Sequence, residues 1–211
     1  DILVEMKACG LCGTDLEKMQ GQYTAAKSVL GHEAAGIVVE TSEDVNQFTV
    51  GDRVFPHHHT PCNNCRFCMK GNETMCTQYR SSNLDPSGFS EYFKVPSWNI
   101  KQGGVLQLPE KVSYEEASFI EPIACCIRGL SRSKISSDDT VLIIGAGPVG
   151  LIHLQLLKHI GSNILISDVN KKRLAIAKTQ GASKIYDVGE CDIPTRIRED
   201  TDGFGADVAL V

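Results

Sequence analysis

Short apolar stretches separated by glycine and proline dominate the first half of this chain. Four of them have the length and residue content of strands, namely residues 2–8, 34–40, 53–57 and 91–95. We therefore expect residues 1–112 to form an irregular, β-rich domain.

A helix-start signal follows this β-rich part. Ser113 and Glu116 fit a capping box that opens a helix through Ile120, because each side chain can bond the backbone amide of the other residue. Pro122 then restarts or kinks the helix, which continues towards Leu130.

The pattern changes again after Asp139, where apolar runs alternate with stretches of helical spacing. The expected strands are residues 141–144, 164–167, 184–188 and 206–211, and the expected helices are residues 149–160 and 170–180. Alternating strands and helices predict an α/β fold with a parallel sheet in residues 113–211.

The composition is that of an ordinary globular protein. Of its 211 residues, 42% are hydrophobic and 22% are charged, and the net charge is -5. No basic run is longer than Lys171–Arg173, which argues against a nucleic-acid partner, and apolar runs such as Val141–Ile144 are too short for a membrane partner. Nine cysteines without a signal-peptide pattern predict a cytoplasmic protein that uses thiols for metal binding.

Four of these cysteines lie within one fifteen-residue loop. Cys62, Cys65, Cys68 and Cys76 have unequal short spacings that let a chain wrap around a tetrahedral zinc ion. Four thiolates leave no open coordination position, so such a site is structural. The alternatives are disulfides, which need an oxidising compartment, and an iron–sulfur cluster, whose bacterial spacing differs at the last cysteine.

A glycine motif lies between an expected strand and an expected helix. Gly145, Gly147 and Gly150, with Pro148 and Val149, match the G-x-G-x-x-G pattern that binds a dinucleotide pyrophosphate at a helix N-terminus. Asp168 ends the next strand, where a carboxylate accepts bonds from ribose hydroxyls and repels a 2′-phosphate, so NAD is expected over NADP. Arg173 would line the same ribose edge. The alternative is a glycine turn beside an exposed acidic residue.

Further residues of metal-ligand type are scattered and individually weak as evidence. They are Cys12 with Asp15, His32 with Glu33, and Glu121 beside Pro122. The three consecutive histidines His57–His59 are of metal-ligand type. However, consecutive residues of a strand face opposite sides, so the three side chains cannot all reach one ion. We expect these three histidines to form a polar strand end near a cleft, and we expect Trp98 to lie in the core.

Together these motifs resemble the zinc-dependent medium-chain dehydrogenase/reductase superfamily, which includes alcohol, sorbitol, threonine and glucose dehydrogenases. The matching segments, in the family's order, are Cys12–Asp15, His32 within Gly31–Gly36, Gly51–Val54, the four-cysteine loop, Gly88–Tyr92, Glu121–Pro122 and Gly145–Gly150. The resemblance implies a GroES-like catalytic domain, a partial Rossmann doubly wound sheet, and an active site in the cleft between them.

The resemblance also implies roles for individual residues. The catalytic zinc ligands would be Cys12, His32 and Glu121. Glu33 would lie behind the metal and replace Glu121 as ligand during turnover, and Asp15 would orient His32. With the cysteine loop, the intact chain would hold two zinc ions.

The implied reaction is oxidation of an alcohol. Zinc would act as a Lewis acid on the substrate hydroxyl, Thr14 would pass on the released proton, and nicotinamide would take the hydride. Glu17 stands where typical alcohol and threonine dehydrogenases have a histidine. Sugar-oxidising relatives have glutamate there, which favours a polyol or sugar substrate. The alternatives are a non-catalytic zinc protein and a zinc-free quinone reductase, which would lack the cysteine loop.

Relatives of this family have more residues before the zinc cysteine and after the glycine motif. We therefore expect the chain to be truncated at both ends and weakly active or inactive by itself. The resemblance implies a homodimer or homotetramer for the intact protein.

Overall fold

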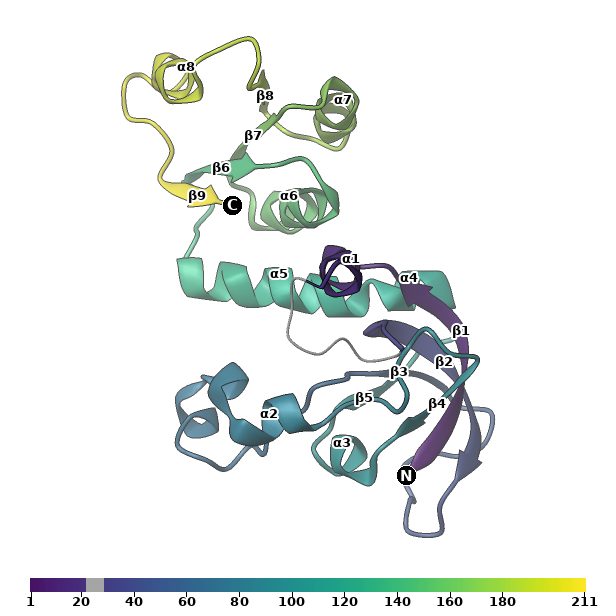
Figure 1. Ribbon diagram of the computed structural model, residues 1–211. Helices are drawn as coiled ribbons and strands as arrows, with labels where there is room; N and C mark the ends of the chain where they lie inside the picture. The colour runs from purple at the N-terminus through teal and green to yellow at the C-terminus, as the bar shows by residue number, and fades with distance from the viewer. Residues whose placement is uncertain (22–28) are drawn as a thin grey trace. The chain divides into compact units, whose positions relative to one another are not determined.

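The computed structural model describes residues 1–21 and 29–211. Contacts between residues divide the chain into two compact units, Asp1–Glu121 and Pro122–Val211, each of which has its own sheet (Figure 1). The two units are described separately below.

The first unit contains an antiparallel sheet that has five strands in the described residues, in the order β4-β1-β2-β3-β5. Its strands are β1 (Ile2–Gly10), β2 (Glu33–Thr41), β3 (Arg53–Pro56), β4 (Tyr92–Val95) and β5 (Val105–Gln107). Ile2 and Val4 alternate with more exposed neighbours and are buried in the core with Phe93, as the period of a half-buried strand requires. The expected strands are confirmed, and β5 was not expected.

Short helices and turns connect the strands of this unit. They are α1 (Gly13–Met19), α2 (Thr77–Ser81), α3 (Ser97–Lys101) and α4 (Tyr114–Ser118), with two 3-10 turns at Cys68–Lys70 and Glu73–Met75. The Ser113 hydroxyl accepts from the amide of Glu116 at 3.1 Å, and the Glu116 carboxylate accepts from the amide of Ser113 at 2.8 Å. This capping box, expected from the sequence, starts α4, which packs on β1 and β2.

The boundary between the units lies inside a helix. α5 (Ile120–Ser133) contains Pro122 in its first turn, where a missing amide hydrogen removes no bond from the helix. Pro122 therefore lies at the start of the helix and does not kink its interior. Because α4 packs on the first sheet, the division follows Glu121, whereas the sequence pattern suggested a boundary after residue 112.

The second unit is a parallel sheet in the order β8-β7-β6-β9. Its strands are β6 (Thr140–Ile144), β7 (Asn163–Asp168), β8 (Lys184–Asp187) and β9 (Val208–Leu210), and its further helices are α6 (Pro148–Ile160), α7 (Lys171–Thr179) and α8 (Ile193–Glu199). The expected parallel α/β arrangement is confirmed.

Helices bury both faces of this parallel sheet. Val141 and Ile143 pack with Leu154 of α6, whereas Leu142 packs with Ile197 of α8. Successive residues of β6 are therefore buried on opposite faces, which explains its unbroken apolar sequence. α8 was not expected, because it carries only a few apolar residues in two turns.

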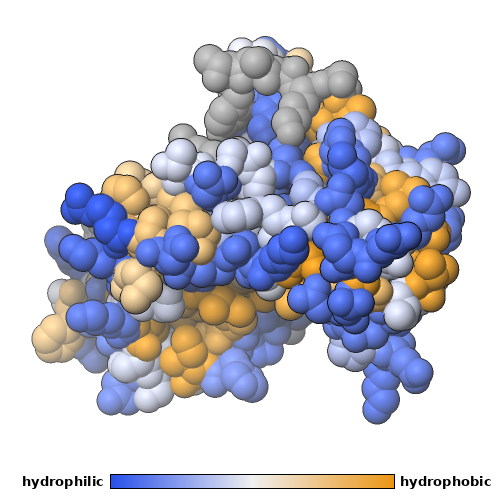
Figure 2. Space-filling view, turned by 90° about the horizontal axis from the view of Figure 1, so that it is seen from below, coloured by the Kyte–Doolittle hydropathy of each residue, from blue (hydrophilic) through white to orange (hydrophobic). Residues whose placement is uncertain are grey.

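The surface is mixed. The face shown in Figure 2 is mainly hydrophilic, with hydrophobic patches between the polar residues. Trp98 is partly exposed, so the expectation of a core position was wrong. Among the described helices, none combines the length and apolar character needed to span a bilayer.

The apolar face of α6 makes a first prediction. Leu154 is fully buried against the parallel sheet. We expect Leu154→Ala to lower the free energy of unfolding by about 2–5 kcal/mol, because it leaves a cavity in the core. Ile176→Ala on α7 is the matched control: this side chain is 48% exposed, so we expect a change within about 0.5 kcal/mol. Urea denaturation of both variants tests this, and equal losses would contradict it.

Candidate metal centres and nucleotide site

Three residues of metal-ligand type meet where β1 ends and β2 begins. One ligand atom each from Cys12, His32 and Glu33 lies within 4.8 Å of the others. The register of the sheet explains this meeting, because Gly10 pairs with Glu33 and Cys12 follows two residues later. Antiparallel pairing therefore brings a cysteine from one segment to a His-Glu pair from another.

The buried carboxylate of Asp15 ties these segments together. One oxygen accepts from the amide of Cys12 at 3.1 Å, and the other accepts from the amide of Gly31 at 3.2 Å. The second oxygen also lies 3.3 Å from Nδ1 of His32. Since Nδ1 faces Asp15, Nε2 is the ring nitrogen left for a metal ion.

The peptide before His32 is held from its other side as well. The carbonyl of Gly31 accepts from Oγ of Ser87 at 2.7 Å and from the amide of Gly88 at 2.9 Å. Gly31 has φ of +94°, and a Cβ there would lie 2.7 Å from the amide nitrogen of Phe89. Only glycine fits this turn without strain.

Glu33 is buried beside Gly10, where a Cβ would meet the Glu33 carboxylate at 1.9 Å. Burial raises the pKa of the Glu33 carboxyl; His32 opposes this rise, whereas the charges of Glu121 and Asp15 add to it. A cation at this cluster would remove the cost of ionising a buried carboxyl.

Glu121 and Thr14 occupy different positions relative to this cluster. Among the described residues, Glu121 is not a member of the close group of ligand atoms, although its charge influences Glu33. The structure thus places Glu33, rather than Glu121, beside Cys12 and His32. The hydroxyl of Thr14 lies 3.6 Å from the Cys12 sulfur.

The three histidines after β3 lie beside this cluster, whereas the sequence indicated only a polar strand end near a cleft. The ring centroids of His58 and His32 are 5.1 Å apart, and His57 and His58 are stacked at 5.0 Å. Burial is the main cause that lowers the pKa of His58 to about 2, and the neighbouring histidines are a smaller one. This ring is therefore neutral. The triplet is not part of a ligand group among the described residues. The sequence spacing of these three histidines does not indicate that they lie near His32.

The four-cysteine loop brings its sulfurs together at distances that suit a metal ion. Separations are 3.6 Å between Cys62 and Cys76, 3.9 Å between Cys62 and Cys68, and 3.5 Å between Cys65 and Cys68. A tetrahedron with zinc–sulfur bonds of about 2.3 Å has edges of about 3.8 Å. All nine cysteines lie in the described part of the chain and are free thiols.

The protonation of these thiols differs strongly. The backbone amide of Cys62 donates to the Cys76 sulfur and lowers its pKa to about 6, whereas burial and the Cys65 thiol raise the pKa of Cys68 to about 12. Neighbouring thiolates repel each other, so the four sulfurs cannot all ionise easily near neutral pH. A divalent cation would remove this repulsion.

The three glycines of the dinucleotide motif have three different environments. Gly145 has φ of +106°, and a Cβ on Gly147 would meet no atom within 4 Å. A Cβ on Gly150 would lie 1.9 Å from the Gly145 carbonyl oxygen. A pyrophosphate-binding loop needs these three features: a tight turn, open space in which the backbone can approach the pyrophosphate, and close packing of the helix. A pocket of about 230 Å³ lies here, and Pro148 and Val149 also line it.

Asp168 connects the end of β7 to this loop. Its carboxylate accepts from the amide of Ala146 and from the amide of Asn170, each at 2.7 Å. Asp168 ends β7, as the spacing predicted. Its carboxylate lies against the glycine turn and is buried, unlike the exposed acidic residue of the alternative. Arg173 is exposed in the first turn of α7.

Two family models match this chain. Residues 1–109 match the alcohol dehydrogenase GroES-like domain, and residues 148–211 match the zinc-binding dehydrogenase model.

Several proteins similar to this chain are dehydrogenases. Sorbitol dehydrogenase of Bacillus subtilis is 34% identical over 99% of this chain and 60% of the relative. L-threonine 3-dehydrogenase of Colwellia psychrerythraea is 33% identical over 90% of this chain and 56% of the relative. The solved structure of an alcohol dehydrogenase from Thermus sp. ATN1 matches with a TM-score of 0.85 at 30% identity, over 99% of this chain and 63% of that one. The chain thus spans about 60% of the length of the curated relatives it matches.

The Asp15 bonds make a prediction about metal affinity. We expect Asp15→Asn to weaken zinc binding at the Cys12, His32 and Glu33 cluster by about 10- to 100-fold, because it loosens the ligand orientation. Competition with a chelator measures this affinity. Asp138→Asn, the same change at an exposed position, is the control and should leave the zinc affinity unaltered. Unchanged affinity in the Asp15 variant would contradict the positioning role.

Proposed function

Because this chain belongs to the zinc-dependent alcohol dehydrogenase family, we propose that the protein oxidises a secondary alcohol with a nicotinamide cofactor. The observation that carries this proposal is the convergence of Cys12, His32 and Glu33 within 4.8 Å. A soft thiolate, an imidazole and a carboxylate form a three-ligand set that leaves zinc one open position.

The catalytic metal would be held by Cys12, His32 and a carboxylate. Glu33 is the carboxylate nearest these two ligands, and Glu121, close enough to influence Glu33, is the second candidate. Zinc would supply Lewis acidity to the substrate hydroxyl, and nicotinamide would accept the hydride.

Residues of the chain itself would orient the reactants and move the proton. Asp15 holds the His32 ring through Nδ1 and so keeps Nε2 directed to the metal position. The Thr14 hydroxyl, 3.6 Å from the Cys12 sulfur, would relay the proton that the substrate releases towards the cofactor ribose and solvent. The amides at the start of α6 and the open side of Gly147 would bind the pyrophosphate.

A second zinc ion in the four-cysteine loop would be structural. The sulfur separations of 3.5 to 3.9 Å support a site in which all four coordination positions are filled by thiolates. Such a site stabilises a loop and performs no chemistry. A non-catalytic zinc protein, the competing function, would need only this ion.

The substrate we propose is a polyol or sugar, and the cofactor is NAD in preference to NADP. Glu17 replaces the histidine of typical alcohol and threonine dehydrogenases, and one of the most similar relatives is a sorbitol dehydrogenase. The Asp168 carboxylate lies against the glycine turn, where its charge would repel a 2′-phosphate. We further propose that the intact protein is a homodimer or homotetramer.

Removing one ligand from each candidate metal site separates their roles. In the intact protein we expect Cys12→Ser to abolish alcohol oxidation while the loop keeps its zinc, because the two ligand sets share no residue. Cys65→Ser should release the loop ion instead. Zinc content and dehydrogenase activity of both purified variants test this. Full activity in the Cys12 variant would refute the catalytic assignment, and a single ion in the unaltered protein would favour the non-catalytic alternative.

The substrate class makes a separate prediction. We expect kcat/KM to be higher for sorbitol and other polyols than for ethanol or L-threonine, and about tenfold or more higher with NAD than with NADP, which corresponds to about 1.4 kcal/mol. A panel of alcohols tested with both cofactors measures this. Preference for simple primary alcohols would overturn the polyol assignment.

A further inference from the structure

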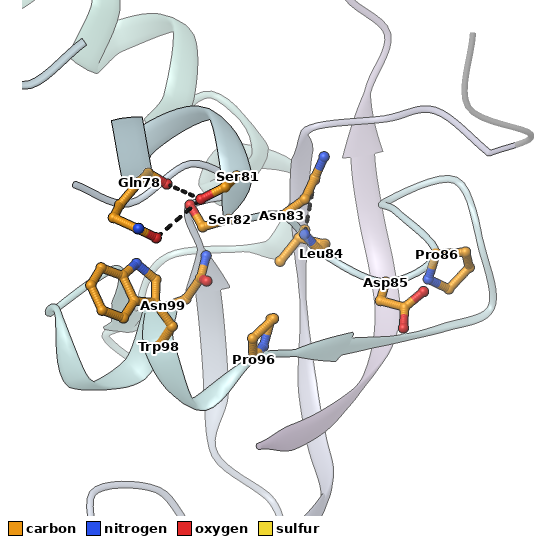
Figure 3. Close-up of a pocket in the computed structure, with 10 residues that line it drawn as sticks. All are labelled: Gln78, Ser81, Ser82, Asn83, Leu84, Asp85, Pro86, Pro96, Trp98 and Asn99. Carbon is orange, nitrogen blue, oxygen red and sulfur yellow. Dashed lines mark hydrogen bonds between the residues drawn. The ribbon is translucent and has the colours of Figure 1, made fainter. Parts of the chain in front are cut away.

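A groove of about 630 Å³ lies in the first unit, and none of the described residues that line it is one of the candidate ligands described above. Figure 3 shows that its walls come from α2 and the segment after it, from Pro96, and from α3. Gln78, Ser82, Trp98 and Asn99 gather at one end, and Asp85 and Pro86 lie at the other. Its size is that of a pocket for a small molecule.

The walls of the groove are polar but carry little net charge. Amide and hydroxyl groups come from Gln78, Ser81, Ser82, Asn83 and Asn99. Among the described wall residues the charged one is Asp85, whose carboxylate pairs with Lys94 at 3.3 Å. The described part of the wall has no lysine, arginine or histidine to pair with an anion.

Trp98 gives the groove a fixed aromatic wall. Its indole Nε1 donates to the carbonyl of Thr60 at 3.2 Å, which holds the ring in one orientation, and the residue is only partly buried. Pro86, Pro96 and Leu84 add apolar surface. A fixed indole beside amides and hydroxyls suits a ligand that has both C–H and hydroxyl faces.

Asn99 adds an unused hydrogen-bond acceptor. The residue is fully buried, and its Nδ2 donates to the carbonyls of His57 at 2.8 Å and His58 at 3.3 Å. Its Oδ1 finds no donor within the described part of the chain. In Figure 3 the Asn99 side chain points towards Ser82 at the groove wall. A buried acceptor without a donor is costly, so a ligand hydroxyl that reaches it gains a strong contact.

We propose that this groove is a binding site for a neutral polyhydroxylated molecule, a linear polyol or a cyclic sugar. Hydroxyl groups would bond the amides and the Asn99 oxygen, and the C–H face would pack on the Trp98 ring. An anion would meet no cation among the described wall residues, and a lipid chain would leave the Asn99 oxygen without a donor. The proposal does not depend on the zinc sites or on the reaction proposed above.

The groove is joined to the neighbourhood of His32 through its walls. The carbonyl of Ser82 lies 2.8 Å from Nδ1 of His59, and Asn99 holds the carbonyls of His57 and His58. The ring of His58 contacts that of His32. A ligand in the groove would therefore stabilise the histidine segment in the position that it has beside the candidate metal cluster.

Trp98 is itself the reporter for a binding experiment, because the sequence contains one tryptophan. We expect titration of the zinc-loaded protein with D-sorbitol, or with methyl glucoside as the cyclic probe, to change the Trp98 fluorescence saturably in the millimolar range. The Trp98→Phe variant, which lacks the tryptophan fluorophore, is the background control. The Cys12→Ser variant should keep the fluorescence response, because Cys12 does not line the groove. A response in this variant therefore does not come from binding at the proposed catalytic site. It would also be seen if the proposed function were wrong.

A wall substitution with a matched control locates the binding. Gln78→Ala should weaken the response by about fivefold, as expected for one lost hydrogen bond, whereas Gln47→Ala, an exposed change outside the groove, should not. A response to only one of the two probes would identify a linear or a cyclic ligand. No saturable response to either probe, or equal affinities in the two glutamine variants, would overturn the proposal.

Discussion

The buried carboxylate of Asp15 is the interaction on which the candidate catalytic site depends. It accepts from the amides of Cys12 and Gly31 and lies against Nδ1 of His32. One side chain thus fixes the start of α1, the turn before β2 and the orientation of an imidazole. A buried carboxylate requires such partners, so burial and positioning reinforce each other. The pairing of β1 with β2 is a second link between the two ligand segments.

The two clusters of ligand atoms differ in a way that suits different tasks. The four thiols of the cysteine loop form a closed, uniform set, and their mutual repulsion explains why a cation would organise the loop. Cys12, His32 and Glu33 form a mixed, three-membered set. Three ligands leave room for a further oxygen, which is the requirement for a metal that meets a substrate. The distinction follows from the number and type of donors.

The nucleotide-binding part depends on a different constraint. A parallel sheet buried on both faces places the end of β6 and the start of α6 next to the end of β7. Glycine is required where the turn has positive φ and where the helix packs on the loop, and Asp168 accepts from an amide of that loop. Strand order and glycine geometry together create the position that we propose for the pyrophosphate.

The sequence by itself determined most secondary structure, the parallel sheet, the glycine motif and the cysteine loop, because each depends on residues close together in the chain. Short elements such as β5 and α8 were not predicted, because a few residues are too short a stretch to show the hydrophobic period of a strand or helix. Only the tertiary structure decided that Glu33 rather than Glu121 lies beside Cys12, that His58 lies beside His32, and that Trp98 lines a groove. These contacts join segments distant in sequence, and strand register and packing, which spacing alone does not encode, determine which segments meet.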